Sequence, residues 1–428
     1  MTRWLVWAIG VALAVAAWAA PPIGLDGDDA VPPTGLPDYR VCAMSAAPDA
    51  ELRLVLGSDR PGWAPVTIIT AAGSDQPFSL AVNEAGGGSG VLPSSAPAGV
   101  VVEELGQASA AALVQSGPTG LAASMCPGRP AETVALAGLS TLEGDSAELV
   151  LANPYAEDAV VTVRSTSELG LDTVAGLESL TVPAGSLLTR NLSEVLALRT
   201  TLAVTVRSER GRVAASVRYA PAGGGVANLE AVALETEWWI PIPEAVADLA
   251  IVVATDSPSA VSVQVDVYGL EGVIEAYVDG EEVDTSRLLT LTRQDLPEGV
   301  TAVRVVASAP VVTGVVFRGE GSAAGGSGAT GLGGRWLLPG AGSSEGAETI
   351  VWVMNPDPAD VTVVLQALVP GARAEPFTVF GESVLGIPLG GGPVPGQLLT
   401  ADGPVAVAWT ARVEAGDRAY AAGVPESG

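Results

Sequence analysis

The sequence predicts an all-β fold, in which tandem immunoglobulin-like β-sandwich repeats follow one N-terminal hydrophobic helix. Three observations predict it. Val-rich segments alternate between apolar and polar residues, which is typical of strands with one buried face. The 52 glycines and 32 prolines punctuate the chain, as short strands joined by tight turns require. A pair of strand-and-turn motifs also recurs about every 90–100 residues, which indicates a repeated unit.

Each predicted repeat opens with an apolar strand, a turn and a second strand. These opening segments occupy residues 50–69, 147–163, 248–265 and 348–364. Their turns contain Asp59-Arg60-Pro61, Asn153-Pro154, Asp256-Ser257-Pro258 and Asn355-Pro356. We expect each Asn or Asp to accept a hydrogen bond from the backbone two residues on, and each Pro to fix the backbone that follows. The chemistry of a turn accounts for this recurrence without any functional role.

The strand after each turn alternates cleanly. In the third repeat the buried face is expected to carry Val261, Val263, Val265 and Val267. Each repeat then closes with a hairpin that has a Gly or Pro turn, at residues 111–128, 202–221, 303–319 and 398–416. A repeat of about 90 residues matches an immunoglobulin-like sandwich. A β-helix would repeat at a shorter period, and a propeller would need more blades of about half this length, so both are disfavoured.

These motifs divide the chain. Residues 1–20 are a signal peptide or membrane anchor, and residues 21–38 are a linker rich in Pro, Gly and Asp. The sandwich repeats are expected at residues 39–128, 129–222, 235–320 and 335–428, with a flexible Gly/Ser linker at residues 321–334. Helix content should be low, with a single turn near Ser193 to Leu198.

The N-terminal segment indicates export. Residues 4–20 are uncharged and apolar, and Arg3 precedes them, as in a signal peptide or a slightly short membrane span. Small residues before Ala20 offer a cleavage site, whereas Pro21 directly after it would hinder cleavage, so a cleaved signal and a retained anchor both fit. We expect an extracytoplasmic protein that is either anchored in the membrane through this segment or secreted after cleavage.

Two cysteines, Cys42 and Cys126, are expected to pair in an oxidising compartment. The bond would tie the first and last strands of the first repeat. In the chain-entropy model a loop of this length is worth about 4–5 kcal/mol. Two buried free thiols are the alternative.

Charge and composition exclude several functions. The formal net charge is −28, so phosphate backbones are repelled and nucleic acid is not an expected partner. All 20 basic residues are Arg, and the chain has no His. Imidazole-dependent nucleophiles, lysine Schiff bases and typical zinc sites therefore lack their residues. We expect no catalytic site, no cofactor and no metal, although these absences do not exclude carboxylate chemistry.

An acidic stretch, Tyr277 to Asp284, gathers four carboxylates, at Asp279, Glu281, Glu282 and Asp284. Calcium binding is one interpretation, because calcium prefers oxygen ligands. A solvated hairpin with Asp279-Gly280 as its turn is favoured, since the spacing of an EF-hand loop is absent. A glycosidase would need two carboxylates that flank a sugar, and 48 acidic residues give such pairs no specificity.

Tryptophans could provide platforms for sugar rings. Those after the N-terminal segment are Trp63, Trp238, Trp239, Trp336, Trp352 and Trp409. Trp238 and Trp336 stand at corresponding places in their repeats, which favours packing between the sheets over a glycan platform. Asn191-Leu192-Ser193 fits the glycosylation sequon, a short pattern that often arises by chance.

The N-terminal segment, the early Cys42, the recurring apolar strand with Asn-Pro and the closing V-x-V-x-S…G-x-V-A-A hairpin resemble the secreted actinobacterial proteins grouped as domain of unknown function 5719. The resemblance covers essentially the exported chain. It implies a location outside the membrane and an association with envelope glycan assembly. It implies no established activity, and no catalytic residues carry over.

The expected function is that of a non-catalytic structural or protein-interaction protein of the cell envelope, with an unknown envelope protein or glycan as its partner. The alternative is a glycan-binding accessory protein of envelope polysaccharide assembly, which needs solvent-facing aromatic side chains. A carboxylate-based hydrolase is a more distant alternative. It needs a deep pocket that holds an unpaired Glu or Asp with a raised pKa.

Overall fold

Nearly all of the regular secondary structure of the computed structural model consists of antiparallel strands, so the predicted all-β fold of tandem sandwich repeats is confirmed. The structure describes residues 38–45, 49–74, 77–92, 98–106, 108–117, 120–172, 174–242, 248–269, 272–319, 321–390, 392–413 and 418–425. All of them belong to one of two parts of the chain, Pro37–Gly428. The helix expected within residues 1–20 lies outside the described residues. Within the described ranges, no helix is long and apolar enough to cross a membrane.

The first two repeats are each built from two facing sheets. The strands of the first are β1 (Tyr39–Met44), β2 (Glu51–Ser58), β3 (Gly62–Thr70), β4 (Gly73–Ser74), β5 (Phe78–Val82), β6 (Gly87–Val91), β7 (Ala98–Glu103), β8 (Ser109–Ser116) and β9 (Ala122–Cys126). The elements of the second are β10 (Thr133–Leu139), β11 (Ser146–Ala152), β12 (Ala159–Ser167), β13 (Gly170–Asp172), β14 (Leu180–Val182), β15 (Leu187–Asn191), α2 (Leu192–Val195), β16 (Leu202–Arg210), β17 (Ala214–Ala220), β18 (Ala227–Glu230) and β19 (Val232–Ala233). One sheet has the order β1-β7-β3 in the first repeat and β10-β16-β12 in the second. The facing sheet has the order β6-β2-β8-β9 or β15-β11-β17-β18, so the two repeats share one topology.

The third and fourth repeats follow the same plan with longer strands. The strands of the third are β20 (Glu235–Pro241), β21 (Asp248–Ala254), β22 (Val261–Gly269), β23 (Gly272–Val283), β24 (Leu289–Thr292), β25 (Val300–Gly319) and β26 (Ser322–Gly326). Those of the fourth are β27 (Gly333–Pro339), β28 (Glu348–Asn355), β29 (Val361–Ala367), β30 (Ala374–Val379), β31 (Ser383–Pro388), β32 (Gly396–Arg412), β33 (Arg418–Ala422) and β34 (Val424–Pro425). In each, one long strand passes from the first sheet into the second: β25 pairs with β20 and β22 and then with β21 and β26, and β32 behaves likewise.

A buried polar residue caps the opening turn of every repeat. These residues are Ser58, Asn153, Thr255 and Asn355. Each side chain accepts a hydrogen bond from the N–H two residues on, at 3.0–3.1 Å. In the first and third repeats the expected caps, Asp59 and Asp256, were therefore wrong by one position. A Ser or Thr hydroxyl accepts the same bond as an Asn amide, so the turn does not need an Asx residue there.

Replacement of Asn355 by Ala is expected to lower the free energy of unfolding by about 2–3 kcal/mol. The fully buried amide nitrogen donates to the carbonyl oxygens of Ala359, Val379 and Phe380, at 2.8–3.3 Å, and all three would lose this partner. Urea unfolding followed by circular dichroism measures the change. Pro356→Ala is the matched control, because it keeps these bonds. An equal loss in both variants would contradict the role given to the amide.

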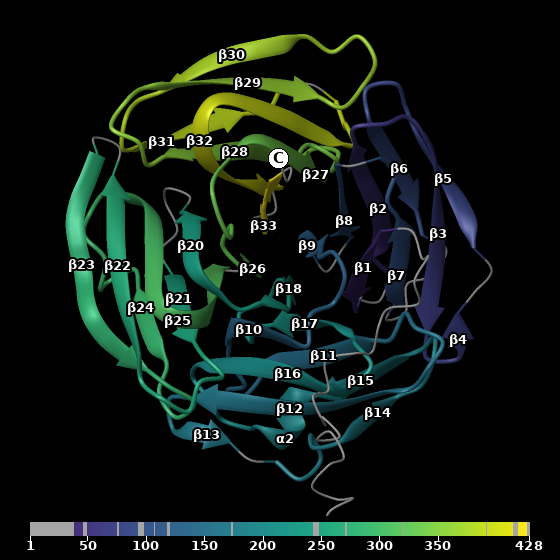
Figure 1. Cartoon of the computed structure of the whole chain (residues 1–428), viewed down its shortest axis with the longest axis vertical. Coiled ribbons are helices and arrows are strands. Elements are labelled where there is room, and N and C mark those ends of the chain that lie inside the picture. The colour runs from purple at the N-terminus through teal and green to yellow at the C-terminus, as the bar shows by residue number, and fades with distance from the viewer. Residues whose placement is uncertain are drawn as a thin grey trace, which may run out of the picture. The chain divides into compact units, whose positions relative to one another are not determined.

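The repeats contact one another in a closed cycle within Pro37–Gly428. The first strand of each repeat packs on the second sheet of the next, so that β1 contacts β17, β10 contacts β25, β20 contacts β32, and β27 of the last repeat contacts β2 of the first. The closing strands form an inner cycle: β9 contacts β18, β18 contacts β26, β26 contacts β33, and β33 contacts β9. Figure 1 shows these four strands near the centre of the view.

The segment at residues 321–334 is not the Gly/Ser linker that the sequence suggested. Ser322–Gly326 is β26, every residue of which is buried, and Ala329 pairs with Trp239. Small residues are needed here because neighbouring strands approach closely. A Cβ at Gly325 would lie 2.8 Å from the carbonyl oxygen of Val315, so packing rather than flexibility accounts for the composition.

Cys42 and Cys126 form a disulfide, with their Cα atoms 4.4 Å apart. Cys42 lies on β1 and Cys126 on β9, which belong to the two facing sheets of the first repeat. The bond therefore joins the first and last strands of that repeat across its core.

Candidate functional site

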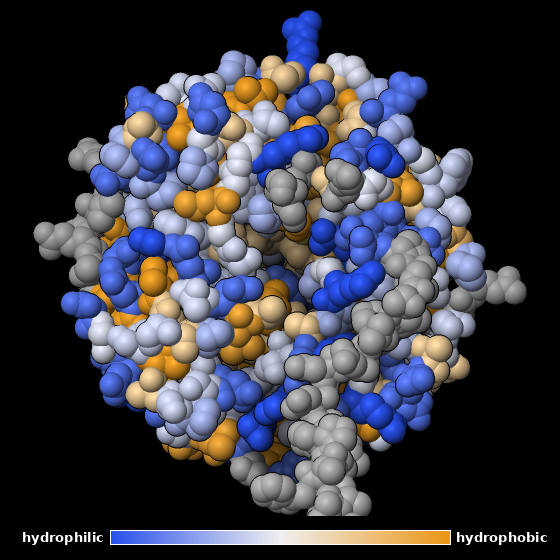
Figure 2. Space-filling view, in the orientation of Figure 1, coloured by the Kyte–Doolittle hydropathy of each residue, from blue (hydrophilic) through white to orange (hydrophobic). Residues whose placement is uncertain are grey.

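A small cavity lies where the four closing strands meet. Its volume is about 210 Å³, and its walls come from the residues that follow β9, β18, β26 and β33, such as Pro127, Val232, Gly328 and Gly423. The molecular surface in Figure 2 is hollowed in this central region. Every repeat thus contributes backbone to one place, and a single buried carboxyl group, that of Glu230, lines it.

Glu230 lies at the end of β18 and is 5% exposed. Burial raises the pKa of this carboxyl to about 7, although the backbone N–H of Met125 and the hydroxyl and backbone of Ser327 act in the opposite direction. The Ser327 hydroxyl donates to the carboxyl at 3.0 Å. Tyr420 of β33 lies close by, and burial first and the Glu230 charge second raise the pKa of its phenol. Side chains and backbone of all four repeats therefore surround one carboxyl.

The environment of Glu230 fits a structural carboxyl better than a catalytic one. Ligand pockets usually enclose about 300–1,000 Å³, and this cavity is smaller. The carboxyl is also hydrogen-bonded by protein groups rather than unpaired. A glycosidase needs a second carboxylate across a cleft that holds a sugar. The geometry at Glu230 does not supply the arrangement that the hydrolase alternative requires.

A larger hollow, which we call the outer groove, lies between the second and third repeats. It encloses about 690 Å³ and is lined by residues of β12, β13 and β16 and of two turns of the third repeat, among them Arg164, Leu171, Asp172, Arg207, Asp256 and Thr285. The guanidinium of Arg164 is 3.6 Å from the carboxylate of Asp256, and about half of the Arg164 side chain stays exposed. Arg207 is 4.0 Å from Glu132 and is similarly exposed. The groove thus presents two accessible cations beside four carboxylates, those of Asp172, Glu178, Glu209 and Asp256.

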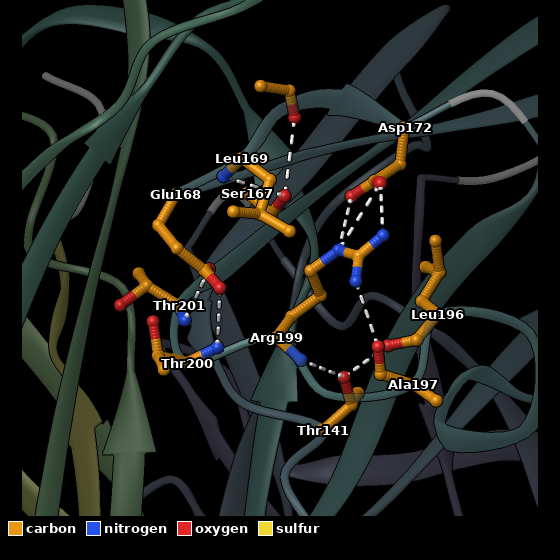
Figure 3. Close-up of polar contacts among 11 residues, drawn as sticks. Thr141, Ser167, Glu168, Leu169, Asp172, Leu196, Ala197, Arg199, Thr200 and Thr201 are labelled. Carbon is orange, nitrogen blue, oxygen red and sulfur yellow. Dashed lines mark hydrogen bonds and ion pairs between the residues drawn. The ribbon is translucent and has the colours of Figure 1, made fainter.

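One wall of the outer groove is held by a polar network (Figure 3). Arg199 binds the carboxylate of Asp172 through Nε and Nη2, at 2.6–3.2 Å. The Glu168 carboxylate accepts hydrogen bonds from the N–H groups of Thr200 and Thr201, both at 3.1 Å. The hydrogen bond from Arg199 lowers the pKa of Asp172. Burial would raise the pKa of Glu168, but the backbone hydrogen bonds outweigh this and lower it, so both groups stay ionised.

The same network fixes a loop, residues 196–201, beside the β12–β13 hairpin. Thr141 Oγ1 accepts from the Arg199 N–H at 3.1 Å and donates to the carbonyl oxygen of Leu196. Leu198 then takes a φ of 62°, in the left-handed region that favours glycine. Its side chain is 63% exposed, so burial does not compensate for the strain. Strain of this kind often marks functional surface.

Apolar side chains are exposed around this network. Leu169 and Leu171 on the hairpin are exposed, as are Val195 at the end of α2 and Leu198 on the loop. In Figure 2, apolar residues reach the surface where β13 lies in Figure 1. The bonds of Glu168 and Asp172 join the two segments that carry them. The network therefore holds exposed apolar groups beside the groove, and one of them, Leu171, lines it.

The acidic stretch is not the hairpin that the sequence suggested. Asp279 and Gly280 lie within β23 as a bulge opposite Gln264, because Val263 pairs with Glu281 and Val265 pairs with Val278. Gly280 has a φ of 75°, which suits a glycine in a bulge. Glu281 pairs with Arg287, and Asp284 accepts hydrogen bonds from Ser286. In the part of the chain that the structure describes, no three acidic or cysteine side chains are placed to hold a metal ion.

Five of the six tryptophans considered above are buried, namely Trp238, Trp239, Trp336, Trp352 and Trp409. Trp238 and Trp336 are fully buried, as their corresponding places predict, and each indole N–H donates to a backbone carbonyl. Trp63 is the exception, with 68% of its surface exposed. Asn191 of the sequon is exposed and caps the predicted helical turn, which is α2, by accepting from Ser193 N–H. That cap gives the motif a structural role.

Sequence reasoning missed the outer groove and its network. Their residues come from several distant segments, and no motif or spacing distinguishes them from other surface Arg, Asp and Glu. The one signal in the sequence was the apolar run Val-Leu-Ala-Leu at residues 195–198, of which only Leu196 is buried, whereas Val195 and Leu198 are exposed.

These features define a class: an all-β protein of sandwich repeats that close into a cycle and display a preformed surface groove. A model of the family of unknown function DUF5719 matches residues 103–330, more than half of the chain, and the chain belongs to that family. No curated protein matches it. A solved structure, the "tetra-tandem repeat in extending region of large adhesion protein", is similar over 90% of this chain and 98% of that chain, at 12% identity and a TM-score of 0.10. A TM-score of this size does not establish a shared arrangement.

Proposed function

We propose that this chain is a non-catalytic interaction protein of the cell envelope, displayed outside the cytoplasmic membrane, and that it binds a protein partner through the outer groove. The observation that carries the proposal is the groove wall, in which the Arg199–Asp172 and Glu168 contacts hold exposed leucines and a strained loop in place. A wall fixed before binding loses little conformational entropy on association. The disulfide supports an oxidising compartment.

The chemistry of the groove suits a folded or extended protein segment. Leu171 offers apolar contact, and Arg164 and Arg207 can pair with carboxylates of a partner. Their present ion pairs are long and partly exposed, so exchange for a partner's carboxylate costs little. We expect no nucleic acid and no cofactor at this site.

Replacement of Leu171 by Glu is expected to abolish partner capture while the fold is retained. The side chain is 47% exposed, so a carboxylate there faces solvent, but it places a charge on the proposed contact surface. Cross-linking of the full chain in envelope membranes, followed by purification and mass spectrometry, measures capture. Val91→Glu is the matched control, because Val91 is similarly exposed on β6 of the first repeat. Capture of the same partner by Leu171→Glu at wild-type yield would contradict the proposal.

The glycan-binding alternative depends on one of the six tryptophans, Trp63, because the other five are buried. Trp63 lies on β3 of the first repeat, whereas the outer groove lies between the second and third repeats.

A further inference from the structure

A strip of uncharged residues on the outer face of the first repeat includes Trp63, and we infer that this strip binds a neutral polysaccharide, with the indole of Trp63 stacked on a sugar ring. The strip consists of Trp63, Pro65 and Thr67 on β3 and Ser79 and Ala81 on β5. It is remote in sequence from the outer groove, so the inference does not depend on the proposed protein partner.

The alternation of β3 places these side chains on one face. Ala64, Val66 and Ile68 point into the core of the first repeat. Trp63, Pro65 and Thr67 therefore point outward. On the neighbouring strand β5, Leu80 and Val82 also belong to the core, which leaves Ser79 and Ala81 on the outer face.

Strand pairing brings the outer residues together. Trp63 lies directly opposite Ala81, and Pro65 lies directly opposite Ser79. On the β5 side the neighbours of the indole are thus small. An exposed aromatic ring beside small side chains offers a platform on which a flat apolar face can rest.

Trp63 has no evident structural role. Its exposed fraction of 68% contrasts with 8% or less for each of the other tryptophans considered above. The described structure contains no hydrogen bond from its indole N–H. The N–H groups of Trp238, Trp336 and Trp352 donate to protein atoms, whereas those of the buried Trp239 and Trp409, like that of Trp63, do not. Tryptophan is enriched at binding surfaces, so a bound ligand would give this exposed indole a function.

The chemistry of the strip selects the ligand class. A pyranose ring has a face of C–H groups that stacks on an indole, and hydroxyl groups at its edge. The hydroxyls of Thr67 and Ser79 can each donate and accept a hydrogen bond, as sugar hydroxyls can. All five residues of the strip are uncharged, in a protein of net charge −28. On the other side of β3, Val101 of β7 lies opposite Thr67, and Glu103 is the next residue on the same face of β7. A neutral polymer meets no repulsion there, whereas an anionic polymer or lipid surface would be repelled.

Affinity electrophoresis of the full chain tests this inference. The gels contain neutral glucans, mannans, galactans or arabinans, and polygalacturonate serves as an anionic polymer. We expect at least one neutral polymer to retard the protein, with an affinity that falls by about tenfold or more in Trp63→Ala and only partly in Trp63→Phe. Phe380→Ala is the matched control: Phe380 is similarly exposed at 66% but lies in the fourth repeat, and its loss should leave retardation unchanged.

Three results would overturn the inference. One is the absence of retardation by every neutral polymer. Another is equal retardation of wild type and Trp63→Ala, with both proteins shown to be folded by circular dichroism. The third is a change in sedimentation that shows Trp63→Ala abolishing self-association instead of polymer binding, because this strip would then be a protein contact. Protection of Trp63 from acrylamide quenching by the retarding polymer, seen as a difference between wild type and Trp63→Phe, would support direct stacking.

Discussion

Removal of the Cys42–Cys126 disulfide is expected to lower the free energy of unfolding of the first repeat by about 4–5 kcal/mol. The bond closes a loop with a sequence separation of 84 residues, and in the chain-entropy model it acts by restricting the unfolded chain. It also joins β1 and β9, which belong to facing sheets. Both side chains are almost fully buried, so their replacement by Ala leaves a cavity, but a small one, because only the two sulfur atoms are removed.

The double variant Cys42→Ala/Cys126→Ala tests this expectation, because neither variant residue leaves a free thiol. Urea unfolding followed by circular dichroism, with hydrogen exchange of the β1 and β9 amides, measures the change. β1 and β9 also contact the second and fourth repeats through β17, β18 and β33. If the double variant loses less than about 1 kcal/mol, these contacts rather than the cross-link hold the first repeat together.

The strand faces within each repeat could be predicted from sequence because local alternation decides them. Val261, Val263, Val265 and Val267 are all buried in the core of the third repeat. The turns were predictable in kind, but Ser58 and Thr255 show that a hydroxyl replaces an Asx residue at the capping position. A prediction that looks only for Asn or Asp therefore places the cap one residue too late in these two repeats.

The closure of the repeats into a cycle could not be predicted, because the strand faces that meet between repeats carry no distinguishing sequence pattern. The strand β26 reads as a flexible Gly/Ser segment, yet it is buried between β18, β25 and β33. At the joint of the second and third repeats, a side chain at Gly314 would overlap the carbonyl oxygen of Ala137. Close approach of two backbones and flexibility both favour glycine, and only the neighbour in space tells them apart.

The outer groove escaped prediction for a related reason. Arg199, Asp172 and Glu168 become a network only when the loop at residues 196–201 lies beside the β12–β13 hairpin. Their spacing in the chain matches no motif. By contrast, Trp63 could be singled out as a candidate, but its exposure could not be predicted, because Trp238 and Trp336 also stand on first-sheet strands and are buried.

The inner cycle is expected to be most stable at acidic pH, because Glu230 is neutral there. The pKa of this carboxyl in the folded protein is about 7, against an ordinary value of 4.5. Between these values the folded state keeps a proton that the unfolded state has released. Stability from this group is therefore complete below about pH 4.5 and is lost as the pH rises through 7. The loss amounts to about 3 kcal/mol.

The comparison of wild type with Glu230→Gln isolates this effect, because the other carboxylates titrate alike in both proteins. Gln stays neutral at every pH. Between pH 5 and pH 8 the free energy of unfolding of the wild type should therefore fall by about 3 kcal/mol relative to that of the variant. Urea unfolding at pH 5, 6, 7 and 8 measures it. Hydrogen exchange should show that the amides of β9, β18, β26 and β33 in the wild type lose protection toward pH 8.

Glu168→Gln serves as the control with the opposite sign. The backbone hydrogen bonds of Thr200 and Thr201 lower the pKa of Glu168, so its contribution to stability is present above the ordinary carboxyl pKa and is lost as the pH falls. Its replacement should leave the decline between pH 5 and pH 8 intact. Parallel curves for wild type and Glu230→Gln over this range would show that the folded protein ionises Glu230 without cost. The four closing strands would then not depend on its proton, and the hydrogen bonds from Met125 and Ser327 would suffice to hold the carboxylate.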